Sequence, residues 1–142
     1  KKDLKTRTYS HLYRNGVVES LESNCIIDKG RDDKKLSMWT IEKETIEYIE
    51  STIKFLDDID IKGPYYILIS FVGIGGFSIV EPSGYFLRPE EITQEEILLP
   101  EVVIQSSSDE VDKKLRPVFD MIWNASGISR SVNFNDDDSF KR

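Results

Sequence analysis

The chain has 142 residues, of which 39% are hydrophobic and 32% are charged, a balance typical of one folded, water-soluble domain. Its formal net charge is −7, which opposes contact between the whole chain and a phosphate backbone. The longest apolar runs are far shorter than the roughly 18 residues of a membrane helix. No apolar segment follows the basic start in the manner of a secretory signal. Neither a membrane protein nor a secreted precursor is therefore expected.

A turn signal near the start predicts a β-hairpin. Asn15 and Gly16 tolerate the positive φ angles of a type I′ turn, and they separate strand-like runs at about residues 8–13 and 17–27. Cys25 lies in the second run and is interpreted as a buried strand residue rather than a reactive thiol. As the only cysteine it excludes a disulfide within the chain, which favours a cytoplasmic protein.

The first strand of this hairpin would carry Tyr9, His11 and Tyr13 on one face, because alternate residues of a strand share a side. His11 is the only histidine, and no nucleophile stands at a recognisable spacing from it. We therefore interpret it as a packed or surface residue rather than a general base. Arg7 and Arg14 are the candidate contacts if this basic end of the chain binds nucleic acid.

An amphipathic helix is predicted at about residues 40–58. Its apolar stripe recurs at intervals of three and four residues and comprises Ile46, Ile49, Ile53 and Leu56, widened by Tyr48, Phe55 and Ile59. Glu42 is assigned to the opposite, charged face. Ser37 or Thr40 is expected to cap the first turn, and Gly63 to mark the end of the segment.

The middle of the chain has the character of strands separated by glycines and prolines. Residues 65–74 are nearly continuous in β-branched and aromatic side chains, which predicts the most buried strand of the domain. Further strands are expected at residues 77–81 and 101–105, with a short one at residues 85–87. Residues 88–100 are acidic and are expected to be partly helical or irregular.

Three glycines, Gly73, Gly75 and Gly76, follow that apolar run and raise the question of a phosphate-binding loop. A P-loop requires a lysine directly after its last glycine, and the next lysine here is Lys113. A dinucleotide fingerprint requires a third glycine where Ser78 stands, followed by a helix, whereas strand-like residues follow. The glycines therefore predict a tight turn or a bulge. A small-molecule sensor or an enzyme at this loop is the alternative.

A second helix is predicted near residue 109, where Ser107 and Glu110 have the spacing of a capping box. Its apolar stripe comprises Val111, Leu115, Val118 and Ile122, with Phe119 and Trp123 beside it. Pro117 is expected either to kink this helix or to mark a second start. Gly127 is expected to terminate it.

The remaining residues that could carry chemistry show no spacing that favours a site. Carboxylates gather at residues 90–91, 95–96 and 136–138 without the spacing of an EF-hand loop, so we interpret them as solvated surface. No metal and no other cofactor is expected. Several aromatic residues are interpreted as the core and rim of a sheet rather than as platforms for stacked bases: Tyr65, Tyr66, Tyr85 and Phe86.

Three stretches resemble a known family. "HLYRNGVVESLES" is similar to a hairpin found downstream of the Schlafen-AlbA type DNA-binding domain in some bacterial proteins. "LRPVFDMIWNASGISRSVNF" resembles a segment near the end of those chains, and "YYILISFVGIGGF" resembles their central apolar strand. The resemblance spans residues 7–134. It implies a C-terminal domain whose nucleic-acid-binding domain lies upstream, and it supplies no catalytic residues.

Together these patterns predict an α+β fold: a mixed or antiparallel sheet of four to six strands, with an N-terminal β-hairpin and two main helices. Residues 1–134 would form a single domain of a longer protein, and residues 135–142 a flexible acidic tail. The leading hypothesis is a non-catalytic accessory domain that mediates self-association or partner contact within a cytoplasmic, DNA-linked protein of regulation or defence; the partner would be a second copy or another domain of the parent protein. Direct nucleic-acid binding through the basic N-terminal hairpin is the alternative.

Overall fold

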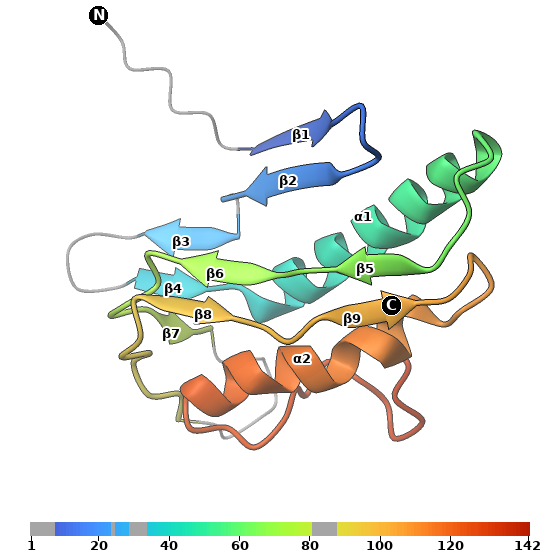
Figure 1. Cartoon of the computed structure of the whole chain (residues 1–142). Helices are drawn as coiled ribbons and strands as arrows, with labels where there is room; N and C mark the ends of the chain where they lie inside the picture. Colours follow the sequence, from blue (N-terminus) through green and yellow to red (C-terminus); the bar gives the residue numbers. More distant parts are fainter. Residues whose placement is uncertain (1–7, 24, 29–33, 81–87) are drawn as a thin grey trace, which may run out of the picture.

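The computed structural model describes residues 8–23, 25–28, 34–80 and 88–142. Within them the chain has the predicted α+β fold, with an N-terminal hairpin and two helices, α1 (Met38–Asp58) and α2 (Val111–Ala125) (Figure 1). In this described part of the chain, no helix combines the length and the apolar character needed to cross a membrane. Some predictions lie outside the described residues: those for Arg7, Tyr85, Phe86 and the strand at residues 85–87.

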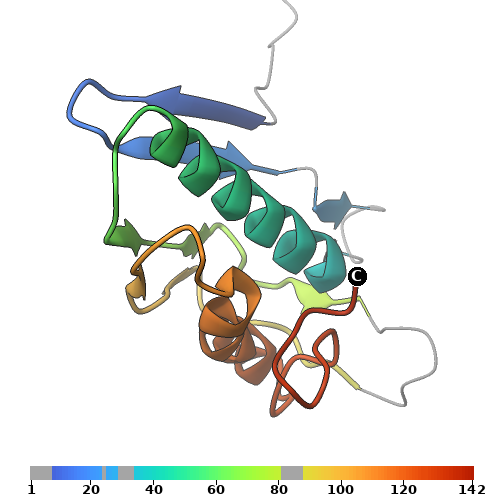
Figure 2. The ribbon, with the colours of Figure 1, turned by 90° about the vertical axis from the view of Figure 1, so that its right-hand side faces the viewer.

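The hairpin consists of β1 (Thr8–Leu12) and β2 (Val18–Glu22), which pair antiparallel as predicted. The predicted type I′ turn is wrong, because Gly16 has a φ of 85° but Asn15 does not have a positive φ. The Gly16 amide donates to the Tyr13 carbonyl at 3.0 Å, so Arg14 and Asn15 are the central residues of the turn and Gly16 follows them. The hairpin lies beside α1 on the side away from α2 (Figure 2). Its side chains remain almost entirely exposed, so it contributes little to the core.

The other strands are short and form small sheets among the described residues. One sheet consists of β3 (Ile26–Asp28), β4 (Lys34–Leu36) and β7 (Ser78–Ile79), in which β4 and β7 run parallel. A second is the antiparallel pair of β5 (Tyr65–Ile67) and β9 (Val102–Ile104). A third is the antiparallel pair of β6 (Ser70–Val72) and β8 (Glu96–Leu98). The strand predicted at residues 17–27 is thus divided in two. Cys25 lies in the turn before β3 and is half-buried, which corrects its assignment to a buried strand.

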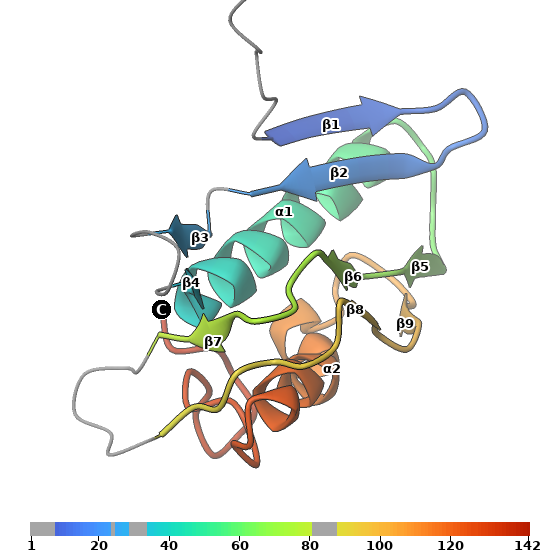
Figure 3. The same cartoon turned by 90° about the vertical axis from the view of Figure 1, so that its left-hand side faces the viewer.

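The β5–β9 and β6–β8 pairs are consecutive parts of one antiparallel ribbon, which we call the central ribbon, residues 65–72 against 96–104. Both helices lie against the same face of this ribbon (Figure 3). Along residues 65–72 the odd-numbered side chains are buried or half-buried, whereas the even-numbered ones are exposed. The prediction of the most buried strand is therefore wrong: this strand is covered on one face only. The expectation for residues 88–100 is also corrected, because β8 forms there.

The core forms between the two helices and the inner face of the central ribbon. The four residues that define each predicted apolar stripe on α1 and α2 are buried, and Phe119 and Trp123 are fully enclosed. Phe55 and Ile59, which the sequence adds to the first stripe, are 49% and 46% exposed. α2 runs without interruption through Pro117, so the predicted second start does not occur. The helical stripes supply one part of the core, and buried residues outside the helices, such as Ile79, Ile92 and Ile104, supply the rest.

The helix ends match the prediction at one terminus only. Neither α1 nor α2 receives a side-chain capping bond at its N-terminus, so the expected capping by Ser37 or Thr40, and by the Ser107–Glu110 pair, is wrong. At the end of α2, Gly127 has a φ of 77° and donates its N–H to the carbonyl of Asn124 at 2.9 Å. The amide after it donates to the Trp123 carbonyl at 3.0 Å, which completes a Schellman motif.

The end of the chain is folded onto α2, where the sequence predicts a flexible tail. Phe134 and Phe140 pair through an isolated β-bridge, are each 5% exposed and stack edge to face at 5.3 Å between ring centroids. The guanidinium of Arg116 on α2 forms an ion pair with Asp138 and donates to the Asn135 carbonyl at 3.2 Å. The apolar Phe140 within an acidic sequence explains why this segment is packed.

Candidate interaction surface

The glycine turn that follows β6 uses its amides within the chain. Gly73 and Gly76 have φ angles of 69° and 77°. The amides of Gly73 and Ile74 donate to the carbonyl of Glu95 at 2.7 and 3.2 Å, and the Gly76 amide donates to the Ile92 carbonyl at 2.8 Å. An anion-binding loop directs such amides toward its ligand. Here they fasten the turn to the segment before β8.

Gly75, between Gly73 and Gly76, is a glycine for a different reason. It does not have a positive φ. A Cβ atom added to it would lie 2.6 Å from a carboxylate oxygen of Glu95, closer than real side chains approach. The three glycines therefore serve two purposes: two of them allow the turn, and Gly75 leaves room for a neighbouring side chain.

The hairpin places a carboxylate among its aromatic residues. Tyr9 and Tyr13 both donate hydrogen bonds to Glu19, the latter at 2.9 Å, and Tyr13 lies 4.3 Å from His11 between ring centroids. The bonds from Tyr9 and then Tyr13 lower the pKa of Glu19, so this surface carries a fixed negative charge. Arg14 is exposed in the turn. A negative charge beside the aromatic rings opposes the stacking of nucleic-acid bases on this face.

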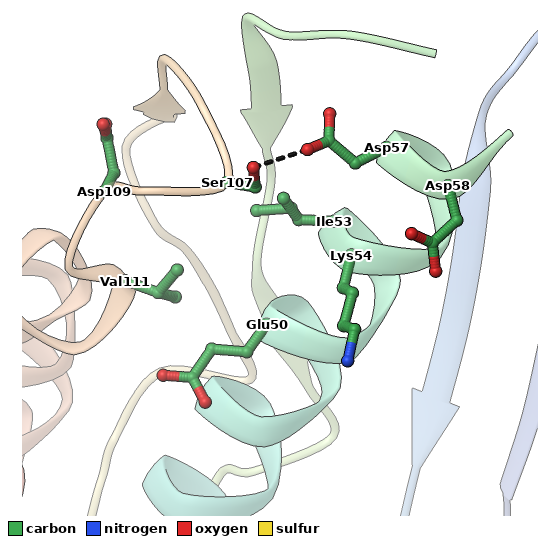
Figure 4. A pocket seen from close by; sticks show the side chains of 8 residues that line it. All are labelled: Glu50, Ile53, Lys54, Asp57, Asp58, Ser107, Asp109 and Val111. Carbon is green, nitrogen blue, oxygen red and sulfur yellow. Dashed lines mark hydrogen bonds between the residues drawn. The ribbon is translucent and has the colours of Figure 1, made fainter. Parts of the chain in front are cut away.

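A shallow acidic pocket lies between α1 and the residues that lead into α2 (Figure 4). It encloses about 330 Å³, and its walls carry the carboxylates of Glu50, Asp57, Asp58 and Asp109. Among the described residues, no three His, Cys, Asp or Glu side chains are arranged so that they could hold a metal ion. The pocket therefore lacks the ligand geometry of a cation site.

Asp57 has a structural role at the edge of this pocket. It accepts hydrogen bonds from Ser107 at 2.5 Å and from Tyr65 at 3.3 Å, and it forms an ion pair with Lys62 at 3.2 Å. The Ser107 bond and then Lys62 hold the pKa of Asp57 below its usual value. These contacts join the end of α1 to the loop before α2 and leave little of this carboxylate for a ligand.

Glu42 is a carboxylate enclosed in the core, not on the charged face to which the sequence assigns it. Its side chain is fully buried and accepts hydrogen bonds from the Trp123 indole at 2.8 Å and from the Asn133 amide at 2.5 Å. Burial raises its pKa from 4.5 to about 7, although these two bonds oppose the shift. A group with no exposed surface cannot meet a substrate, so Glu42 links α1, α2 and the chain end.

A sequence signal for the burial of Glu42 does exist. It precedes Ile46 by four residues and Ile49 by seven, which places it on the apolar stripe of α1. The assignment to the charged face followed residue type rather than spacing. Trp123 on the stripe of α2 supplies an N–H donor that also requires a partner when buried.

The outer face of the central ribbon carries apolar side chains that are more than half exposed. Tyr66, Leu68, Val72 and Leu98 are 62%, 75%, 66% and 69% exposed. Cross-strand pairing sets Tyr66 opposite Val103, and the face continues past Ser70. Both helices lie on the other side of the ribbon (Figures 1 and 3). Contiguous exposed apolar side chains of this kind mark binding surfaces.

Carboxylates lie beside the apolar side chains of this outer face. Glu96 lies directly opposite Val72 in the ladder and is exposed, and Glu101 is exposed between β8 and β9. The central ribbon itself, residues 65–72 and 96–104, contains no lysine or arginine.

No protein-family model, no curated protein and no solved structure matches this chain.

Proposed function

We propose that this chain is a non-catalytic interaction domain whose contact surface is the outer face of the central ribbon. The observation that supports this most is the exposure of Tyr66, Leu68, Val72 and Leu98 on one side of a ribbon whose other side is packed against two helices. A strand that is apolar on both faces is typical of a sheet covered on both sides. A partner would supply the missing cover.

The chemistry of the other candidate sites agrees with this proposal. The amides of the glycine turn at Gly73, Ile74 and Gly76 are engaged with carbonyls, and the buried Glu42 has no exposed surface. The domain would act within a cytoplasmic protein of regulation or defence, beside a nucleic-acid-binding domain. That context follows from the resemblance to chains with a Schlafen-AlbA type domain.

Site-specific photo-crosslinking tests the proposal in the full parent protein. A photoreactive phenylalanine analogue at position 68 or 98 is expected to form a defined covalent adduct in cells. The matched control is the same analogue at the exposed position 44 on α1, away from the outer face. The mass of the adduct shows whether the analogue has crosslinked to a second copy, to another domain of the same chain or to a different protein. Adducts at 68 and 98 no more abundant than at 44 would contradict an interaction role for this face.

A further inference from the structure

The outer face of the central ribbon combines an apolar centre with an acidic rim, and that combination narrows the class of partner. The centre consists of Tyr66, Leu68, Val72 and Leu98, each more than 60% exposed. Glu96 faces outward beside Val72, because paired residues of an antiparallel ladder share a side. A docked partner would remove water from this carboxylate, and an unpaired charge left at the edge of an apolar contact is unfavourable.

We propose that the occupant of this face is a polypeptide segment with apolar side chains at its centre and lysine or arginine residues at its flanks. This inference rests on the proposed function and adds the chemistry of the partner. The apolar side chains of the segment cover Leu68 and Leu98, and its cations meet Glu96 and Glu101. The net charge of −7 attracts such a segment from a distance as well.

A second copy of the chain fits this face less well. In a two-fold symmetric dimer the same surface meets itself. Glu96 and Glu101 of both copies would then surround one apolar centre, with no lysine or arginine on either central ribbon to pair with them. The two chains also repel as whole bodies, each with a charge of −7. Self-association would therefore need salt to screen the repulsion, whereas the proposed partner would bind best at low salt.

Fluorescence anisotropy with three labelled synthetic peptides tests the assignment. The first has alternating leucines flanked by lysines, the second has glutamates in place of the lysines, and the third keeps the lysines but has serines in place of the leucines. The first is expected to bind at least about tenfold more tightly than either of the others, because it alone offers both chemistries. Its affinity should fall severalfold between about 50 and about 300 mM NaCl.

Variants of the chain locate the binding. The double variant Leu68→Ser, Leu98→Ser should weaken binding of the first peptide at least about tenfold, since both side chains are already exposed and their loss leaves the core intact. Glu96→Gln with Glu101→Gln should weaken it and flatten its salt dependence. Glu44→Gln with Glu47→Gln removes the same charge from the exposed side of α1 and should change little. Circular dichroism melts verify that each variant is folded.

The outcomes separate this inference from the proposed function. Equal binding of the first and third peptides, or full binding by the Leu68→Ser, Leu98→Ser variant, would show general attraction to an acidic chain and would overturn the partner assignment. A dimer in sedimentation equilibrium that tightens with salt and is lost in that variant would overturn it in favour of a second copy. If no peptide binds while photo-adducts form at position 68, the interaction domain stands and the partner class proposed here is wrong.

Discussion

Glu42 makes the stability of this domain depend on pH near neutrality. Burial raises the pKa of its carboxyl from 4.5 to about 7 in the folded chain. The folded state therefore binds the proton more tightly than the unfolded state does. The stability that the raised pKa of Glu42 contributes is fully present below pH 4.5 and is lost as the pH rises through 7. Each pKa unit corresponds to about 1.4 kcal/mol, so the shift amounts to roughly 3 kcal/mol.

Replacement of Glu42 by glutamine removes this dependence, because the amide keeps the shape of the protonated acid and does not titrate. We compare the free energy of unfolding of the original chain with that of Glu42→Gln. The difference between them is expected to fall by roughly 3 kcal/mol between pH 4.5 and 7.5. Urea titrations at several pH values measure it. The fluorescence of Trp123 provides a local signal, since its indole donates to the Glu42 carboxylate.

The matched control is Glu44→Gln, which removes a carboxylate two residues away on the exposed side of α1. Its unfolding free energy should follow that of the original chain across the whole pH range. Asp120, a nearby carboxylate that also raises the pKa of Glu42, is present in all three proteins. Parallel curves for the original chain and Glu42→Gln would refute the reasoning, because they would show that Glu42 has the same pKa in the folded and unfolded states.

Three further predictions concern local packing. Phe140→Ala should lower the free energy of unfolding by about 3 kcal/mol, because the ring is buried against Phe134; an unchanged thermal melt would show that the chain end is not folded onto α2. Gly76→Ala should lower the free energy of unfolding by about 1 kcal/mol, because position 76 has a positive φ. Gly75→Ala should lower it less, because the new Cβ meets a movable carboxylate. Equal losses of unfolding free energy in urea titrations would contradict these different roles of the two glycines. Iodoacetamide should alkylate Cys25 more slowly in the folded chain than in urea at pH 8, since burial raises its pKa; equal rates would disprove it.

The elements that the sequence predicts well are those specified by local chemistry. Gly16 marks the hairpin turn, because a positive φ is required there and few other residues accept it. The stripes on both helices recur at helical spacing and are buried as expected. Gly127 ends α2 for the same kind of reason, since a positive φ is required there. Each of these signals lies within a few consecutive residues.

The features that the sequence does not predict depend on contacts between elements that are far apart in the chain. Residues 65–72 have the composition of a strand covered on both sides, and composition cannot show that both helices pack on the same side. The partners of Glu42 lie 81 and 91 residues away, in α2 and in the chain end. Spacing along α1 indicates that Glu42 faces inward, but only the tertiary contact explains why a carboxylate is tolerated there.

The pairing of the central ribbon also bears on how an exposed apolar strand avoids aggregation. From Tyr66 to Ser70 the chain takes four steps, whereas the facing chain takes five from Leu98 to Val103, so one strand carries an extra residue opposite Leu68. An extra residue bends a ribbon and increases its twist, and a bent edge is a poor template for other strands. This extra residue lies opposite the most exposed leucine of the face. Deletion of Pro100 would regularise the ladder, and we expect such a chain to aggregate more readily.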